Sequence, residues 1–210
     1  AAAPHLAARP VVVHAADFSQ REAAPGGLLT LAGVRAERIA AGGLEMAALP
    51  AADGESQFQL PYAFSSNSFQ LEVSAGGQSM AFPLRLKETS PAVLMDRDGT
   101  PFVIEAESGV AVDAMNPLRG GMKIQILATG LGRVTPEWPA GSPAPDTDTP
   151  RVVAKVTVRI NDIELRQVEA RLAPGYTGFY LIEAHLPPIM DEGPAELRVE
   201  AGGNQSGPVR

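Results

Sequence analysis

The sequence predicts an all-β protein of two tandem β-sandwich units, the first smaller and less complete than the second. Three observations predict this fold: several runs alternate apolar and polar residues, two stretches recur at the same offset, and helical patterns are weak. Glycine and proline, 21 and 19 of the 210 residues, provide the frequent turns that short strands need.

The first half contains one clear strand pattern and one weak helical signal. Apolar and polar residues alternate over 69–74, and Gly76-Gly77 closes that strand with a turn. Residues 34–48 are rich in alanine and carry glutamate and arginine, but Gly42-Gly43 interrupts them. We therefore expect at most one or two helical turns there.

The second half contains most of the strand patterns. Alternation extends over residues 122–127, 153–160, 163–168, 179–186 and 195–201. The dipeptide Asn161-Asp162 separates two of these runs, as the two-residue turn of a β-hairpin does. We predict a complete sandwich over residues 93–210. Its predicted core residues are Val156, Val158, Ile160, Tyr180, Ile182, Leu197 and Val199.

An internal repeat relates the two halves. Leu60-Pro61 precedes Gly76-Gly77 at the same spacing as Leu186-Pro187 precedes Gly202-Gly203. Two copies of one β unit therefore follow each other along the chain. The segment before Leu60 is much shorter than its counterpart before Leu186, so we expect the first copy to lack about one hairpin and a loop.

The chain divides into a linker and two units. Residues 1–10 are rich in alanine and proline and resemble a linker. Ser90-Pro91 is expected to be an extended connector, because proline disfavours the α conformation at the preceding residue. We predict unit 1 over 11–88 and unit 2 over 91–210. The chain starts without a methionine or a signal peptide, and we interpret it as part of a longer protein.

Several segments resemble a known family. They are His14–Phe18, Ala24–Gly26, Gln59–Tyr62, Ala128–Gly132, Val134–Pro136, Gly141–Pro145, Leu172–Tyr180 and Leu186-Pro187. Together they resemble the uncharacterised Solibacter-type C-terminal domain family of acidobacterial proteins, over roughly residues 11–210. The resemblance implies tandem immunoglobulin-like units, similar to the IPT/TIG class, in exported or cell-surface proteins. Residues 34–58 depart from the family, which has a longer segment there. The family implies no catalytic residue.

Composition and motifs argue against several functions. A net charge of −7 disfavours a nucleic-acid partner, and no run of 18 apolar residues could span a membrane. The sequence has no cysteine, and its three histidines lack metal-ligand spacing. Asp96–Gly99 resembles the start of a calcium loop, but Pro101 occupies the position that needs glycine, so we predict a hairpin turn. Nucleophile-elbow and dinucleotide motifs are also missing. We therefore expect no enzyme activity, metal or cofactor.

Two aromatic residues are the candidates for ligand contact. Trp138 lies in a proline-rich stretch, residues 134–150, that we expect to be a long, semi-rigid surface loop. Tyr176 lies in a Gly-Tyr-Thr-Gly turn. Exposed rings at such positions suit carbohydrates or peptides. The alternative is that Trp138 anchors its own loop on the sandwich and that Tyr176 packs at a corner.

These features favour a non-catalytic, exported module that displays, spaces or attaches a larger protein at the bacterial cell surface. Its partner would be a protein or a glycan. Two alternatives remain open. One is an accessory carbohydrate-binding module of a secreted hydrolase. The other is an enzyme such as a glycosidase, which would need two carboxylates about 5–10 Å apart in a cleft.

Overall fold

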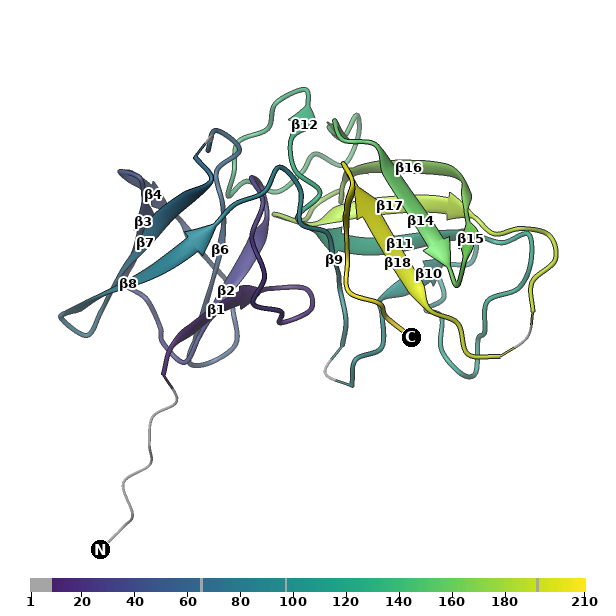
Figure 1. The fold of residues 1–210 in the computed structure, drawn as a ribbon, viewed down its shortest axis with the longest axis horizontal. Helices are drawn as coiled ribbons and strands as arrows, with labels where there is room; N and C mark the ends of the chain where they lie inside the picture. Colours follow the sequence, from purple (N-terminus) through teal and green to yellow (C-terminus); the bar gives the residue numbers. More distant parts are fainter. Residues whose placement is uncertain (1–8, 65, 97, 192) are drawn as a thin grey trace, which may run out of the picture.

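The computed structural model describes residues 9–210 except 65, 97 and 192, and this part of the chain contains β-strands and no α-helix. The strands form two β-sandwiches that lie next to each other (Figure 1). We call them the N-terminal sandwich, β1–β8, and the C-terminal sandwich, β9–β19. Among the described residues, no helix is long and apolar enough to cross a membrane.

The N-terminal sandwich consists of two four-stranded antiparallel sheets. Their strand orders are β1-β2-β6-β5 and β4-β3-β7-β8. The strand bounds are β1 Val11–His14, β2 Leu28–Ala32, β3 Arg38–Ala41, β4 Leu44–Met46, β5 Ala48–Leu49, β6 Glu55–Gln59, β7 Ser68–Ala75 and β8 Gln78–Arg85. Leu31 and Phe58 from one sheet and Ile39 and Leu71 from the other are buried in a shared core.

The predicted helical turns within residues 34–48 are wrong. The segment forms the hairpin β3–β4, and Gly42 and Gly43 are its turn, with φ angles of 54° and 81°. Positive φ suits glycine and is incompatible with a helix. Ile39 is buried and pairs with Val73, so sheet pairing and burial outweigh the helix propensity of the alanines.

The C-terminal sandwich is larger. A seven-stranded sheet has the order β10-β11-β17-β16-β13-β12, with β9 also paired to β11, and it faces a sheet of order β15-β14-β18-β19. The strand bounds are β9 Ala92–Val93, β10 Val103–Glu105, β11 Lys123–Thr129, β12 Val134–Thr135, β13 Arg151–Val152, β14 Val156–Ile160, β15 Ile163–Glu164, β16 Arg166–Leu172, β17 Tyr180–His185, β18 Leu197–Ala201 and β19 Asn204–Gln205.

Six of the seven predicted core residues of this sandwich are buried. They are Val158, Ile160, Tyr180, Ile182, Leu197 and Val199. Val156 is only half-buried, which corrects the prediction for that position. The short β15 pairs with Arg159 and Ile160 alone, so the edge of β14 is open beside Val156. A shallow groove of about 440 Å³ lies there.

The strand topology confirms the internal repeat. Leu60 follows β6 and Leu186 follows β17, and these strands occupy corresponding places in their sheets. The turns Gly76-Gly77 and Gly202-Gly203 then lead into β8 and β19, and all four glycines have positive φ. The N-terminal sandwich has no counterpart of the hairpin β12–β13 or of β9 among the described strands. It is the smaller and less complete unit, as predicted.

Candidate functional site

The site with the most specific geometry is the junction between the two sandwiches. Thr129, fully buried at the end of β11, accepts a hydrogen bond on its Oγ1 from the Leu28 backbone N–H at 2.8 Å. The same hydroxyl donates to the Gly178 carbonyl at 2.9 Å. Gly178 packs directly against the Leu28 side chain, where a Cβ would lie 2.9 Å from Leu28 Cδ1. A single threonine therefore joins β2 of one sandwich to the strand system of the other.

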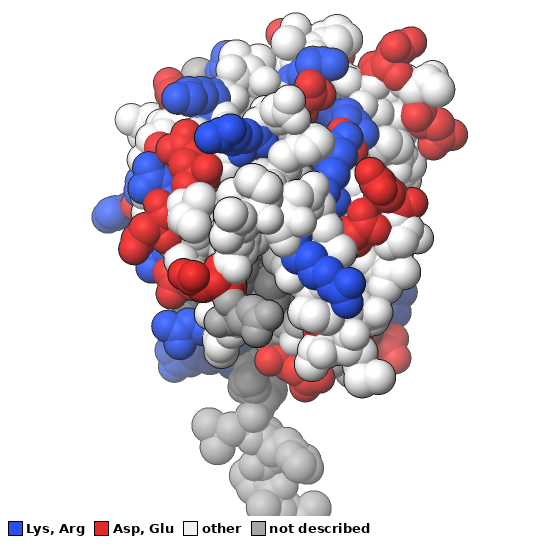
Figure 2. All heavy atoms as spheres, turned by 90° about the vertical axis from the view of Figure 1, so that its right-hand side faces the viewer, with Lys and Arg blue, Asp and Glu red and all other residues white. Residues whose placement is uncertain are grey.

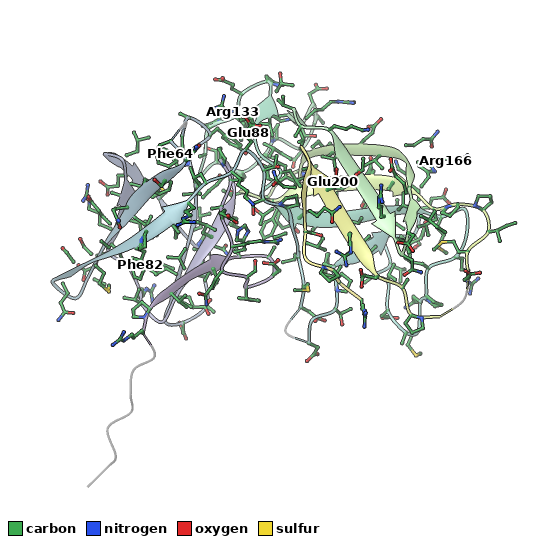
Figure 3. All side chains as sticks on the ribbon, viewed as in Figure 1. Phe64, Phe82, Glu88, Arg133, Arg166 and Glu200 are labelled. Atoms are coloured by element: carbon green, nitrogen blue, oxygen red, sulfur yellow. The ribbon has the colours of Figure 1, made fainter. Side chains whose placement is uncertain are left out.

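The connector between the sandwiches is also fixed. The Thr89 hydroxyl donates to the Ala201 carbonyl at 2.6 Å, and the Ser90 N–H donates to the Gly130 carbonyl at 2.7 Å. A Cβ at Gly130 would lie 2.1 Å from the Ser90 oxygen, so this close approach requires glycine. Figure 3 places Glu88 and Arg133 where this connector passes β12. The connector behaves as part of the C-terminal sandwich.

The proline-rich stretch forms a strap across the junction, which we define as residues 136–150. Its Gly141 N–H donates to Gln59 Oε1 in the N-terminal sandwich at 2.7 Å. Gln59 Nε2 in turn donates to the Gly26 carbonyl at 3.0 Å. Figure 1 shows this segment above the gap between the two sandwiches, next to β12. The sequence predicted a surface loop here, but not that it bridges two units.

Trp138 lies at the base of the strap. Its indole Nε1–H donates to the Pro143 carbonyl at 3.2 Å, and its ring packs, half-buried, on the core of the C-terminal sandwich. This geometry favours the anchoring role over free ligand contact, because the only N–H of the ring is used within its own loop.

Tyr176 lies in the same loop cluster with a freer ring. Its backbone N–H donates to Ala173 at 3.1 Å and its carbonyl accepts from Ala144 in the strap at 2.9 Å. The ring meets Phe179 edge to face, with centroids 6.4 Å apart, yet the residue is 58% exposed. The structure therefore brings the loops of Trp138 and Tyr176 together and leaves one aromatic ring open to solvent.

Two neighbouring tyrosines, Tyr62 and Tyr180, lie buried or half-buried near the junction. The hydroxyl of the fully buried Tyr180 donates to the Gly132 carbonyl at 2.6 Å. Burial raises the pKa of Tyr180 well above its usual value, and the neighbouring Tyr62 raises it further. Burial also raises the pKa of Tyr62. Both phenols stay neutral at physiological pH, so their role here is structural. The sequence pattern placed Tyr180 in the core but carried no sign of this contact.

Four glutamates of the C-terminal sandwich form ion pairs: Glu164, Glu169, Glu183 and Glu196. Burial raises the pKa of Glu183, but hydrogen bonds from Gln125 and Arg171 and the charges of Arg171 and Lys123 outweigh it, so the pKa lies below its ordinary value. Glu169 is the cross-strand neighbour of Glu183. Among the described carboxyl groups, each pKa shift that is resolved is downward, whereas a glycosidase acid needs an upward shift.

The described residues contain no cluster of three or more histidine, aspartate or glutamate side chains suited to a metal ion. Asp96 Oδ1 accepts hydrogen bonds from the backbone N–H groups of Asp98 and Thr100. Met95 and Pro101 form an isolated antiparallel β-bridge. The predicted hairpin turn is confirmed. On the face turned to the viewer in Figure 2, acidic and basic side chains are interspersed, which is not the single-sign surface that a polyanion binds.

Comparisons with known proteins find distant likenesses only. No family model and no curated protein matches the chain. SGBP-B of the Bacteroides ovatus mixed-linkage glucan utilization locus, in complex with a mixed-linkage heptasaccharide, shares 12% identity and a TM-score of 0.40, over 88% of this chain and 39% of that one. SGBP-B from a complex xyloglucan utilization locus in Bacteroides uniformis is 10% identical in sequence, with a TM-score of 0.29. The match covers 95% of this chain and 46% of that one.

The titin I9-I11 tandem shares 11% identity and a TM-score of 0.24, over 88% of this chain and 91% of that one. The chain spans less than half the length of the two Bacteroides proteins. All these TM-scores are below 0.5, so the likenesses carry no argument about function.

Proposed function

We propose that this chain is a rigid, non-catalytic module that spaces or displays a larger protein at the bacterial cell surface. The observation that carries the proposal is the junction, where the buried Thr129 hydroxyl accepts a hydrogen bond from Leu28 of the other sandwich and is itself held by the Gly178 carbonyl. Domains joined by a flexible linker move relative to each other by default. The exported location is part of the proposal and is supported by the family resemblance of residues 128–145 and 172–180.

Three separate segments oppose rotation of one sandwich against the other. The connector is bonded through Thr89 and Ser90, and the strap is bonded through Gly141. The loop between β1 and β2 is bonded through Ala16, whose carbonyl accepts the Met95 N–H at 3.0 Å. A hinge needs a few residues free to change φ and ψ. Here each crossing segment is held by hydrogen bonds, which suits a spacer of constant length.

X-ray scattering in solution tests the proposal. The intact chain should fit one conformation at all dilutions, and a Thr129→Val, Gln59→Ala double variant should require an ensemble of orientations. A Thr157→Val, Gln70→Ala double variant, altered on outer strand faces, is the matched control and should scatter like the intact chain. An intact chain that itself requires an ensemble would contradict the proposal.

A second candidate function is glycan binding at Tyr176. The supporting observation is that this ring is 58% exposed although its backbone is held by two hydrogen bonds. A ring fixed in place stacks on the flat face of a sugar with little loss of conformational entropy. The acidic Asp146 lies close to Gly175 in the same cluster and offers an acceptor for hydroxyl groups.

Calorimetric titration with mixed-linkage gluco- and xylogluco-oligosaccharides tests this second function. Binding should be lost in Tyr176→Ala and kept in Phe18→Ala, which removes a ring of similar exposure, 55%, from a different loop. Equal binding by both variants would rule out Tyr176 as the contact, and no binding by the intact chain would rule out these glucans.

A further inference from the structure

Residues 15–23, the first part of the loop between β1 and β2, are a bridge between the sandwiches, and we call them the junction loop. Its Ala16 carbonyl accepts the Met95 N–H, and its Arg21 Nη1 donates to the Gln205 carbonyl of β19 at 3.4 Å. Its other end is fixed to the N-terminal sandwich, where the Ala23 N–H donates to Arg85 at 2.9 Å. The loop therefore contacts both sandwiches, and its conformation affects their relative position.

A buried histidine, His14, forms a hydrogen bond to the backbone of this loop. His14 is 1% exposed at the end of β1, and its Nε2 lies 3.0 Å from the Glu22 carbonyl, to which it donates. The ring is therefore the neutral form that carries its proton on Nε2. Its Nδ1 is buried and has no hydrogen-bond partner among the described residues. A second proton on Nδ1 would have no acceptor in this conformation.

The charges around His14 also oppose that proton. The Arg21 guanidinium and the Asp17 carboxylate are the charges that act on His14, and Asp17 is already paired with Arg21 and with the Ser19 hydroxyl. Burial, followed by the Arg21 charge, lowers the pKa of His14, against the raising effects of Asp17 and the Glu22 and Arg21 backbone carbonyls. The Glu22 carboxylate faces Lys87 and stays ionised, because its own pKa is lowered.

We propose that His14 makes the junction loop an acid-sensitive latch. When His14 takes up a proton, it becomes a buried cation next to Arg21, and residues 15–23 open so that this charge reaches water. The opening breaks the Ala16–Met95 and Arg21–Gln205 hydrogen bonds. The two sandwiches then gain freedom of orientation. This inference rests on the rigid module proposed above and adds its regulation.

The sign of the pH effect follows from linkage. The open or unfolded loop binds a proton on His14 near the ordinary histidine pKa of about 6.5, and the closed loop binds it only at lower pH. The closed state is therefore fully stable above about pH 6.5 and loses stability as pH falls toward the lowered pKa.

Pulsed spin-label distance measurements test the latch. The chain has no cysteine, so Gln70→Cys and Asp162→Cys, both at exposed positions, place one label on each sandwich. At pH 7.5 the distance distribution should be narrow, and at pH 5.5 it should broaden. His14→Gln, which keeps an N–H donor but cannot titrate, should stay narrow at both values. His185→Gln, at a more exposed position on β17, is the matched control and should broaden like the parent.

Each outcome separates the two proposals. A parent distribution that is narrow at both pH values overturns the latch alone, as does equal broadening in His14→Gln. A parent that is already broad at pH 7.5 overturns the rigid module and the latch with it. If His14→Gln does not fold, an NMR titration of the His14 ring in the unmodified chain replaces it, and a pKa at or above 6.5 overturns the latch.

Discussion

Thr129 shows at the residue scale how the two sandwiches are joined. A hydroxyl both accepts and donates, so this side chain satisfies one backbone donor and one backbone acceptor that face each other across the junction. Valine has the same shape but neither capacity. Buried polar groups that lose their partner keep the whole cost of leaving water, which makes this position sensitive.

Thr129→Val should lower the free energy of unfolding by about 1–3 kcal/mol, because the Leu28 N–H is then buried without an acceptor. Urea denaturation measures the change. Thr157→Val is the control: Thr157 is half-exposed on β14, and valine suits a strand, so stability should change little. Equal effects in both variants would mean that the Thr129 hydrogen bonds contribute nothing measurable.

At the scale of the element, β17 is the central strand of the larger sheet, between β11 and β16. Ile182 is fully buried on it and pairs with Ile126. Ile182→Ala should destabilise the fold by about 2–5 kcal/mol through lost burial and a cavity. Ile163→Ala removes the same atoms from a residue that is 45% exposed on β15, and it should cost far less in the same thermal melt. Similar melting temperatures would contradict the observed register.

Trp138 is the strap's own anchor on the C-terminal sandwich. Trp138 packs on the core and bonds Pro143, and nothing comparable anchors the neighbouring exposed Glu137. Trp138→Ala should therefore speed cleavage after Glu137 by a glutamyl endopeptidase several-fold, while Tyr176→Ala should leave the rate close to that of the parent. A strap that stays equally resistant without Trp138 would be held by its remaining bonds, to Gln59 and between Ala144 and Tyr176.

The sequence predicted elements better than it predicted their contacts. Period-2 alternation located β14, β17 and β18, because one face of each strand is apolar. The prediction failed at residues 34–48, where the alanine content indicated helical turns. There a glycine turn and pairing with β7 impose a hairpin. Tyr176 and Trp138 were recognisable as candidates, whereas Thr129, Gln59 and His14 were not. Their importance arises from partners far away in the chain, which no local pattern reports.

At the scale of the whole molecule, the chain is two sandwiches with separate cores and one shared junction. The buried residues of each core come from its own half of the chain, so each half has an apolar centre to fold around. Yet Leu28 and Ala16 of the N-terminal sandwich are fully buried, and they lie where the C-terminal sandwich contacts it. The smaller unit therefore depends on its neighbour for part of its burial.

Separate expression of residues 11–88 and 91–210 tests this dependence. The larger fragment keeps its whole core and should unfold cooperatively. The smaller one exposes Leu28 and leaves its N–H without Thr129, and sandwiches of this size bury a small share of their surface. For a domain of 60–100 residues, each kcal/mol lost lowers the melting temperature by about 4–8 °C, so the fragment should melt well below the intact chain and less sharply. If it melts as sharply and at the same temperature, the junction does not stabilise the N-terminal sandwich, and the two units are independent.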